Sequence, residues 1–276
     1  MKTIRPLTAT LSAVAMLAMS TATWAPSIGT AFVAMIVSAT ASHAALVVHY
    51  DFENNVNDQS GNGNNGTLGG AASYVADSPF PGGNSLSTTT DASSVDVGAA
   101  GSLTSSVFTL AYWIRATNNQ NPSAGLERLS SRGGDSFETA IGDANVVGGT
   151  TSITGATLSY FAPGLGAWQV TNAAAPIGNW VHVAWVNDAN MTLYLDGVSV
   201  YTGTAVANSG SGALRIASRE NTGPVEGFDG AMDDFRFYDT PLSATEIASL
   251  ATIPEPSSAL LIATCGLVTI LRRRRS

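Results

Sequence analysis

The chain has 276 residues, of which 45% are hydrophobic and only 12% are charged. Lys2 and Arg5 lie near its start and Arg272–Arg275 near its end, which leaves six arginines between them against all 20 acidic residues. This interior has a net charge of about −14, which argues against nucleic acids and anionic membrane surfaces as partners. The only cysteine, Cys265, lies in an apolar run near the C-terminus, so the rest of the chain has no disulfide, zinc–thiolate site or cysteine nucleophile.

Residues 1–44 have the composition of an export signal. A positively charged start is followed by two apolar stretches, Leu7–Met19 and Ala31–Val37. Ser42 and Ala44 then supply the small residues of a cleavage site. We expect a signal peptide that is cleaved after Ala44; the alternative is an N-terminal membrane anchor.

Residues 45–252 contain short stretches rich in β-branched and aromatic residues, separated by runs of Gly, Asn, Ser and Pro. In the strongest stretch, Val107–Arg115, large apolar residues alternate from Phe108 to Ile114 and would face one side of a sheet. Further expected strands are Leu46–Phe52, Thr67–Leu68, Ser85–Thr89, Ser94–Val97, Leu126–Ser131, Phe137–Ile141, Ala156–Phe161, Ala167–Thr171 and Leu214–Ala217. The pattern predicts an all-β fold built of two antiparallel sheets.

The stretch from Asn179 to Tyr201 predicts three consecutive antiparallel strands. These strands are Trp180–Val186, Met191–Leu195 and Val198–Tyr201. Asp196-Gly197 joins the second to the third and is typical of a two-residue type I′ turn, which needs positive φ at both residues.

One short helix is expected at the end of this region. Ser243 and Glu246 have the spacing of a capping box, in which each side chain binds the backbone N–H of the other residue. Leu242, Ile247 and Leu250 would then pack on the sandwich.

Several segments together resemble laminin-G-like (concanavalin A-like) jelly-roll domains over about residues 46–250. They are Tyr50–Glu53, Asp58–Thr67, Phe108–Arg115, the Trp-Val-His-Val-Ala and Leu-Tyr-Leu-Asp-Gly motifs within 180–197, Phe228–Tyr238 and Pro241–Ile247. The resemblance implies a two-sheet antiparallel jelly-roll sandwich, a common extracellular module, and it does not identify a ligand.

The resemblance also implies a structural calcium ion where the first and last strands meet. Calcium takes six to eight oxygen ligands, and carboxylates from distant strands can supply them. The candidates are Asp51, Glu53, Asp58, Asp229, Asp233 and Asp234. Asp233 is the first choice because it begins the final strand. The alternative is that all six are turn-forming and surface carboxylates.

Tyr160 and Trp168 flank a loop at Pro163-Gly164 and are candidates for stacking on sugar rings, although core packing is the competing explanation. In one family of glycosidases that resemble this chain in fold, the two carboxylates lie on one strand as Glu-x-Asp-x-Glu or a one-residue expansion of it, and no such run occurs here. We therefore expect no catalytic residues, with a glycan-active enzyme as the alternative.

The C-terminal residues 253–276 combine three features in a fixed order. Pro254-Glu255-Pro256 precedes the uncharged run Ser257–Leu271, and Arg272, Arg273, Arg274 and Arg275 follow. The arrangement resembles the PEP-CTERM sorting signal of Gram-negative bacteria. It implies transient insertion of a transmembrane tail in the inner membrane, processing by an exosortase, and delivery to the cell surface or exopolysaccharide. The alternative is an ordinary C-terminal anchor.

Taken together, the motifs predict an exported, non-enzymatic protein of the cell surface or extracellular matrix that binds carbohydrate or protein. Its domains are then a signal peptide (1–44), a jelly roll (45–252) and a sorting signal (253–276). A purely structural matrix protein is the other alternative. Ligand, oligomeric state and calcium occupancy stay open at this point.

Overall fold

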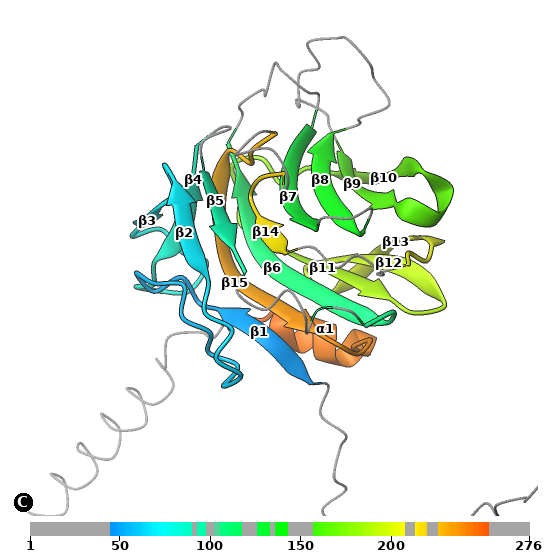
Figure 1. Ribbon diagram of the computed structural model, residues 1–276, viewed down its shortest axis with the longest axis horizontal. Helices are drawn as coiled ribbons and strands as arrows, with labels where there is room; N and C mark the ends of the chain where they lie inside the picture. The colour runs from blue at the N-terminus through cyan, green and yellow to red at the C-terminus, as the bar shows by residue number, and fades with distance from the viewer. Residues whose placement is uncertain are drawn as a thin grey trace, which may run out of the picture. The chain divides into compact units, whose positions relative to one another are not determined.

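The computed structural model describes residues 45–89, 93–97, 103, 105–117, 126–132, 136–142, 157–207, 213–219 and 226–253. Over these residues the protein is a sandwich of two antiparallel β-sheets (Figure 1). The elements are β1 (Leu46–Tyr50), β2 (Thr67–Gly70), β3 (Ser73–Val75), β4 (Ser85–Thr88), β5 (Ser93–Asp96), β6 (Phe108–Ala116), β7 (Leu126–Arg132), β8 (Glu138–Gly142), β9 (Thr157–Ala162), β10 (Ala167–Ala174), β11 (Val181–Asn187), β12 (Asn190–Leu195), β13 (Val198–Thr204), β14 (Leu214–Ile216), β15 (Gly230–Tyr238) and α1 (Ala244–Leu250). The predicted all-β jelly-roll sandwich is confirmed.

The two sheets interleave strands that are far apart in sequence. Sheet A has the order β13-β12-β11-β6-β15-β4-β3, and β1 also pairs with β15. Sheet B has the order β10-β9-β8-β7-β14-β5-β2. Because β1 and β15 are the first and last strands, the two ends of the sandwich domain meet in sheet A.

The core lies between the inner faces of the sheets. Phe108, Leu110, Tyr112 and Ile114 of β6 are all buried in it, which confirms the predicted alternation. Trp185 of β11 is also fully buried, and its Nε1 donates to the Tyr112 hydroxyl at 3.1 Å. Each large side chain buried in this way contributes about 1.5–3 kcal/mol.

The predicted three-stranded meander is present as β11, β12 and β13. Asp196 and Gly197 have φ values of +46° and +79°, as a type I′ turn requires. Strand β13 continues to Thr204, beyond the predicted end at Tyr201. The extension follows from pairing with β12, which continues to Asn190 opposite Thr204. Gly203 fits this stretch, since a Cβ there would lie 2.6 Å from the hydroxyls of Tyr160 and Tyr201.

The helix α1 packs on the outer face of sheet A. Ser243 and Glu246 form the predicted capping box, and Ile247 is fully buried in a small apolar cluster with Leu242 and, at its edge, Leu250.

Strand β3 was not predicted, because three residues provide too little pattern for a strand. Within the described residues no helix is long and apolar enough to cross a membrane. The predicted signal peptide (1–44) and the Pro-Glu-Pro and arginine motifs of the tail lie outside the described residues.

Candidate functional site

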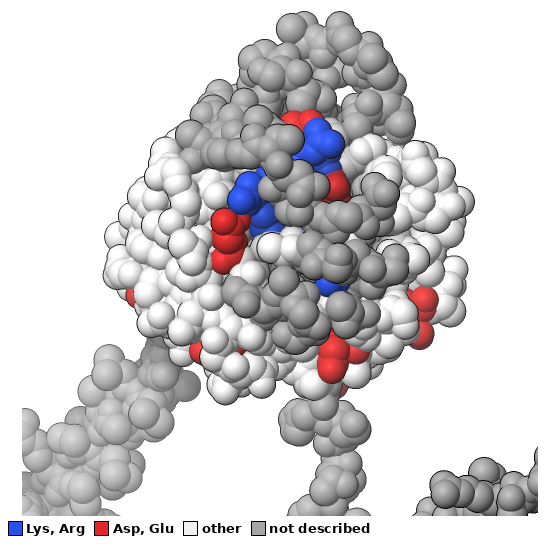
Figure 2. Space-filling model, viewed as in Figure 1, with Lys and Arg blue, Asp and Glu red and all other residues white. Residues whose placement is uncertain are grey.

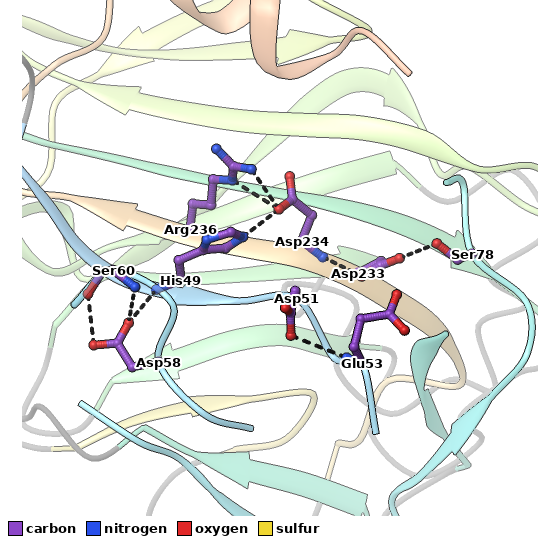
Figure 3. Close-up of polar contacts among 9 residues, drawn as sticks. All are labelled: His49, Asp51, Glu53, Asp58, Ser60, Ser78, Asp233, Asp234 and Arg236. Atoms are coloured by element: carbon purple, nitrogen blue, oxygen red, sulfur yellow. Dashed lines mark hydrogen bonds and ion pairs between the residues drawn. The ribbon is translucent and has the colours of Figure 1, made fainter. Parts of the chain in front are cut away.

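The junction of β1 and β15 brings several of the predicted calcium ligands close to one another (Figure 3). Asp234 lies at a β-bulge with a φ of +49°, and this conformation turns its side chain toward the first strand. Its Oδ1 accepts from His49 Nε2 at 2.7 Å and from Arg236 Nε and Nη2 at 3.0 and 2.9 Å. The Asp234 carboxylate therefore ties the two terminal strands together.

Asp233 bonds to a different part of the fold, although it is the next residue. Its Oδ2 accepts from Ser78 Oγ at 2.6 Å and its Oδ1 from the Asp234 backbone N–H at 2.7 Å. Burial raises the pKa of Asp233 to about 7, with Asp234 and Glu53 adding to the rise and the two hydrogen bonds opposing it. This carboxyl fastens the segment before β4 to the last strand.

Asp58 is the centre of the loop that follows β1. Its Oδ1 accepts from the backbone N–H groups of His49 and Ser60, and its Oδ2 from Ser60 Oγ and the Asn64 N–H, all within 3.0 Å. Partial burial works to raise the pKa of Asp58, but these hydrogen bonds outweigh it and hold the pKa below its usual value. Asp58 therefore acts as a structural organiser of the loop.

The other three candidates lie in separate arrangements. Glu53 accepts from the Asn84 N–H and Nδ2 at 3.0 and 2.9 Å, and Asp51 accepts from the Glu53 N–H at 3.3 Å. Asp229 immediately precedes β15, and its N–H donates to Glu127 Oε2 at 3.4 Å. In the described part of the chain, no three His, Cys, Asp or Glu side chains are grouped so that they could hold a metal ion. The six carboxylates are thus divided among separate hydrogen-bond arrangements in this structure, and the calcium site stays a prediction.

His182 of β11 lies on the outer face of sheet A and is almost completely buried. Its ring meets Trp113 edge-on, with the ring centroids 5.4 Å apart. Burial lowers the pKa of His182 to about 4, against the opposing effect of Asp234, so the imidazole is neutral at physiological pH. Its burial and its contact with Trp113 give His182 a structural role in the sheet.

The two predicted stacking aromatics have different environments. Tyr160 is fully buried, its hydroxyl donates to the Thr204 carbonyl at 3.0 Å, and its ring contacts Trp185. It therefore offers no face to a sugar, and core packing explains its position. Trp168 instead lies on the outward face of sheet B, half-buried beside Phe161.

Trp168 is one end of a row of side chains that crosses all seven strands of sheet B. The strand register places Thr67, Asp96, Arg215, Ser131, Glu138, Phe161 and Trp168 opposite one another in that order. Thr139 and Tyr160, the neighbours of this row on β8 and β9, point inward, since Thr139 bonds to core Tyr112 and Tyr160 is buried. The row is therefore on the outward face.

Arginine and acidic side chains gather in a band on this face (Figure 2). The Arg128 guanidinium lies 4.8 Å from the centre of the Trp168 ring and is ion-paired with Glu138 and, at 2.6 Å, with Glu226. Arg215 pairs with Asp96 at 2.5 Å. Because Arg128 is held from two sides, it fixes the Trp168 ring by a cation–π contact.

The same pairing bears on the alternative of a glycan-active enzyme. Each described carboxylate of the band, namely Asp96, Glu138 and Glu226, is paired with an arginine. A retaining glycosidase needs one carboxyl as acid/base and a second as nucleophile, about 5 Å apart. The described part of the band offers no such unpaired couple.

Sequence reasoning selected Trp168 but missed Arg128 and its partners. The available signal was the charge inside strands of a chain that has few charges: Arg128 and Glu138 lie within predicted strands or beside them. Their partnership depends on the register of β7 and β8, which the sequence pattern did not supply.

A laminin-G-like family model, described as the concanavalin A-like lectin/glucanases superfamily, matches residues 88–248. No curated protein sequence matches the chain significantly. Among solved structures, domain 4 of AbnA, a GH43 extracellular arabinanase from Geobacillus stearothermophilus in complex with arabinotriose, is 18% identical, with a TM-score of 0.57 over 76% of this chain and 99% of that one.

Two toxin structures share the same fold. The binding domain of Paraclostridial Mosquitocidal Protein 1 is 15% identical, with a TM-score of 0.56 over 75% of this chain and 52% of that one. A botulinum neurotoxin type C structure is described with the cell entry of that toxin, which depends upon interaction with two ganglioside molecules. It is 16% identical, with a TM-score of 0.53 over 75% of this chain and 50% of that one. The chain spans about half the length of these toxin chains, and at such identities the similarity shows the fold alone.

Proposed function

The chain belongs to the concanavalin A-like lectin/glucanases superfamily, and from this premise we propose that it is an exported, non-enzymatic carbohydrate-binding protein. It acts at the cell surface or in the exopolysaccharide matrix, with the outward face of sheet B as its binding surface. The observation that carries the proposal is the half-buried Trp168 ring, held in place by Arg128 on that face.

Trp168 and Arg128 have the properties of a saccharide site. Small-molecule sites combine aromatic surface with a few fixed polar groups. Here Trp168 and Phe161 supply the aromatic surface, and the paired arginines and carboxylates supply donors and acceptors in fixed positions. Support also comes from two proteins of the same fold, the arabinanase domain described with arabinotriose and the neurotoxin described with gangliosides.

The test is the binding of the full chain, purified in mild detergent, to an array of bacterial polysaccharides. Trp168→Ala is expected to weaken binding at least tenfold. Trp180→Ala is the matched control, because Trp180 is also half-buried and has an arginine, Arg115, 5.8 Å from its ring centre, but it lies outside sheet B. Equal binding by both variants and the wild type would reject this surface as the site.

Delivery by the C-terminal tail is part of the proposal and rests on the Pro254–Pro256 motif, the apolar run and the terminal arginines. In a host that contains an exosortase, Glu255→Ala is expected to keep the chain in the inner-membrane fraction. A Ser257→Ala control should be released like the wild type. Unchanged release of the Glu255 variant would favour a tail that is an ordinary anchor or is processed in another way.

A further inference from the structure

A groove lies on the outer face of sheet A, between the β11–β12 turn and the start of α1. It has a volume of about 460 Å³. Its lining includes Asp188, Asn190, Thr192, Tyr194, Leu242 and Glu246. A cavity of this size is within the range of small-molecule sites, about 300–1,000 Å³.

The walls of the groove are fixed by the fold. Leu242 is buried in the apolar cluster beneath α1, and its N–H donates to Thr109 Oγ1 at 2.8 Å. On the helix side, Glu246 Oε2 accepts from the Ser243 N–H at 2.8 Å. Strands β11 and β12 pair in continuous register up to their two-residue turn. The groove is therefore formed before any ligand binds, which lowers the entropic cost of binding.

The polar side chains of the groove differ from those of the β1–β15 junction. In the described part of the protein, no hydrogen bond uses the side chains of Asp188, Asn190 or Thr192 or the hydroxyl of Tyr194. Four polar groups thus line one groove without a protein partner, and the Tyr194 ring there is partly exposed. At the junction, by contrast, the carboxylates of Asp58, Asp233 and Asp234 are bonded within the fold.

The lining also indicates the charge of a ligand. It contains the carboxylates of Asp188 and Glu246 and no lysine or arginine. Carboxylate and amide oxygens accept hydrogen bonds from hydroxyl groups, whereas an anionic ligand would be repelled. A ring with several hydroxyls and no charge matches an aromatic side chain flanked by such acceptors.

We propose that this groove is a second saccharide site, specific for a neutral sugar unit. The inference rests on the proposed carbohydrate-binding function and extends it to a new surface. Helix α1 covers the outer face of sheet A, whereas Trp168 lies on the outward face of sheet B. One molecule would then hold two sugar chains on opposite faces and cross-link a matrix polysaccharide.

Calorimetric titration of the full chain in mild detergent tests the second site. The probes are arabinotriose, cellotriose and mannotriose as neutral sugars and trigalacturonic acid as the acidic one. Asp188→Ala and Thr192→Val are each expected to weaken one of two neutral-sugar sites about tenfold, the effect of losing one hydrogen bond to a polar or charged group. Thr202→Val is the matched control, because Thr202 lies opposite Thr192 on β13 but does not line the groove. Both substituted groove residues lie at the surface or half-buried, so melting curves should match the wild type.

The variants separate this inference from the proposed function. Two neutral-sugar sites, one lost in Trp168→Ala and the other in Asp188→Ala, support both. Loss of all binding in Trp168→Ala, with Asp188→Ala and Thr192→Val unaffected, overturns the second site and keeps the first. Loss of sugar binding in the groove variants alone would support the groove as a saccharide site and reject the sheet B surface. Tighter binding of trigalacturonic acid than of neutral sugars at the groove overturns its specificity.

Discussion

Asp233 and Asp234 are consecutive residues, yet their carboxylates bond to different segments of the chain. Asp233 holds the segment around Ser78, and Asp234 holds His49 of the first strand. A β-bulge between Asp233 and Arg236 explains this, since it gives Asp234 a positive φ and places its carboxylate beside His49 and Arg236. Two adjacent acids that were candidate calcium ligands in the sequence therefore each bind a different segment of the chain to β15.

Asp58→Ala is expected to destabilise the fold by about 2 kcal/mol at pH 7, because the partners of four hydrogen bonds lose their acceptor. The folded pKa of Asp58 is lowered, so this contribution is present above the unfolded pKa of 3.8 and is lost as the pH falls below it. Urea unfolding at pH 7 and pH 3 measures the difference. Asp51→Ala, which removes one long hydrogen bond, is the control. An equal effect of the two substitutions would contradict the organising role of Asp58.

Asp233 gives a pH dependence of opposite sign. The unfolded chain ionises this carboxyl near 3.8, whereas the folded protein keeps it protonated up to about pH 7. The contribution of Asp233 to stability is therefore fully present below pH 3.8 and is lost as the pH rises through 7, by an amount on the order of a few kcal/mol. Asp233→Asn should remove this slope. Unfolding curves of both proteins at pH 4.5, 6 and 8 check it, and parallel pH profiles would show that Asp233 is ionised in the fold.

At the scale of elements, the turn between β12 and β13 packs against helix α1. A Cβ on Gly197 would lie 2.9 Å from Ala248 Cα, and the φ of Gly197 is +79°. Both the backbone conformation and the space between turn and helix thus require glycine.

Gly197→Ala is accordingly expected to cost about 2 kcal/mol or more, the sum of left-handed backbone strain and displacement of the helix. Gly164→Ala provides the comparison, since nothing lies within 4 Å of its Cβ position and its φ is not positive. Thermal melts of the two variants measure the difference, and the Gly197 variant should have the lower melting temperature. A Gly197 variant as stable as the Gly164 variant would mean that α1 does not pack tightly on the turn.

Elements with a strong local pattern were predictable from the sequence. The alternation of β6, the Asp196-Gly197 turn and the Ser243–Glu246 capping box each depend on residues close together in the chain, and all are confirmed. The candidate sites were not predictable to the same degree. Arg128 meets Glu226 across 98 residues and Asp234 meets His49 across 185, and such contacts depend on the topology of the sheets.

At the scale of the whole molecule, the resemblance to laminin-G-like domains implied a structural calcium ion, and the fold distributes the candidate acids among separate partners. Thermal melts in millimolar calcium and in chelator are therefore expected to coincide. A structural calcium ion would instead raise stability by about 2.7 kcal/mol at a hundredfold excess over its Kd. A clear upward shift that Asp233→Asn abolishes would restore the calcium site and show that the junction rearranges around the ion.

The measurement that tests the central claim most directly combines binding and turnover in one sample. The full chain is incubated with the polysaccharide that it binds best, and sedimented protein and new reducing ends are both quantified over time. We predict that protein sediments with the polysaccharide, that Trp168→Ala reduces this at least tenfold, and that no reducing ends form. Reducing ends that accumulate with the wild-type chain would show a glycan-active enzyme, and protein that stays in solution with every polysaccharide would contradict carbohydrate binding.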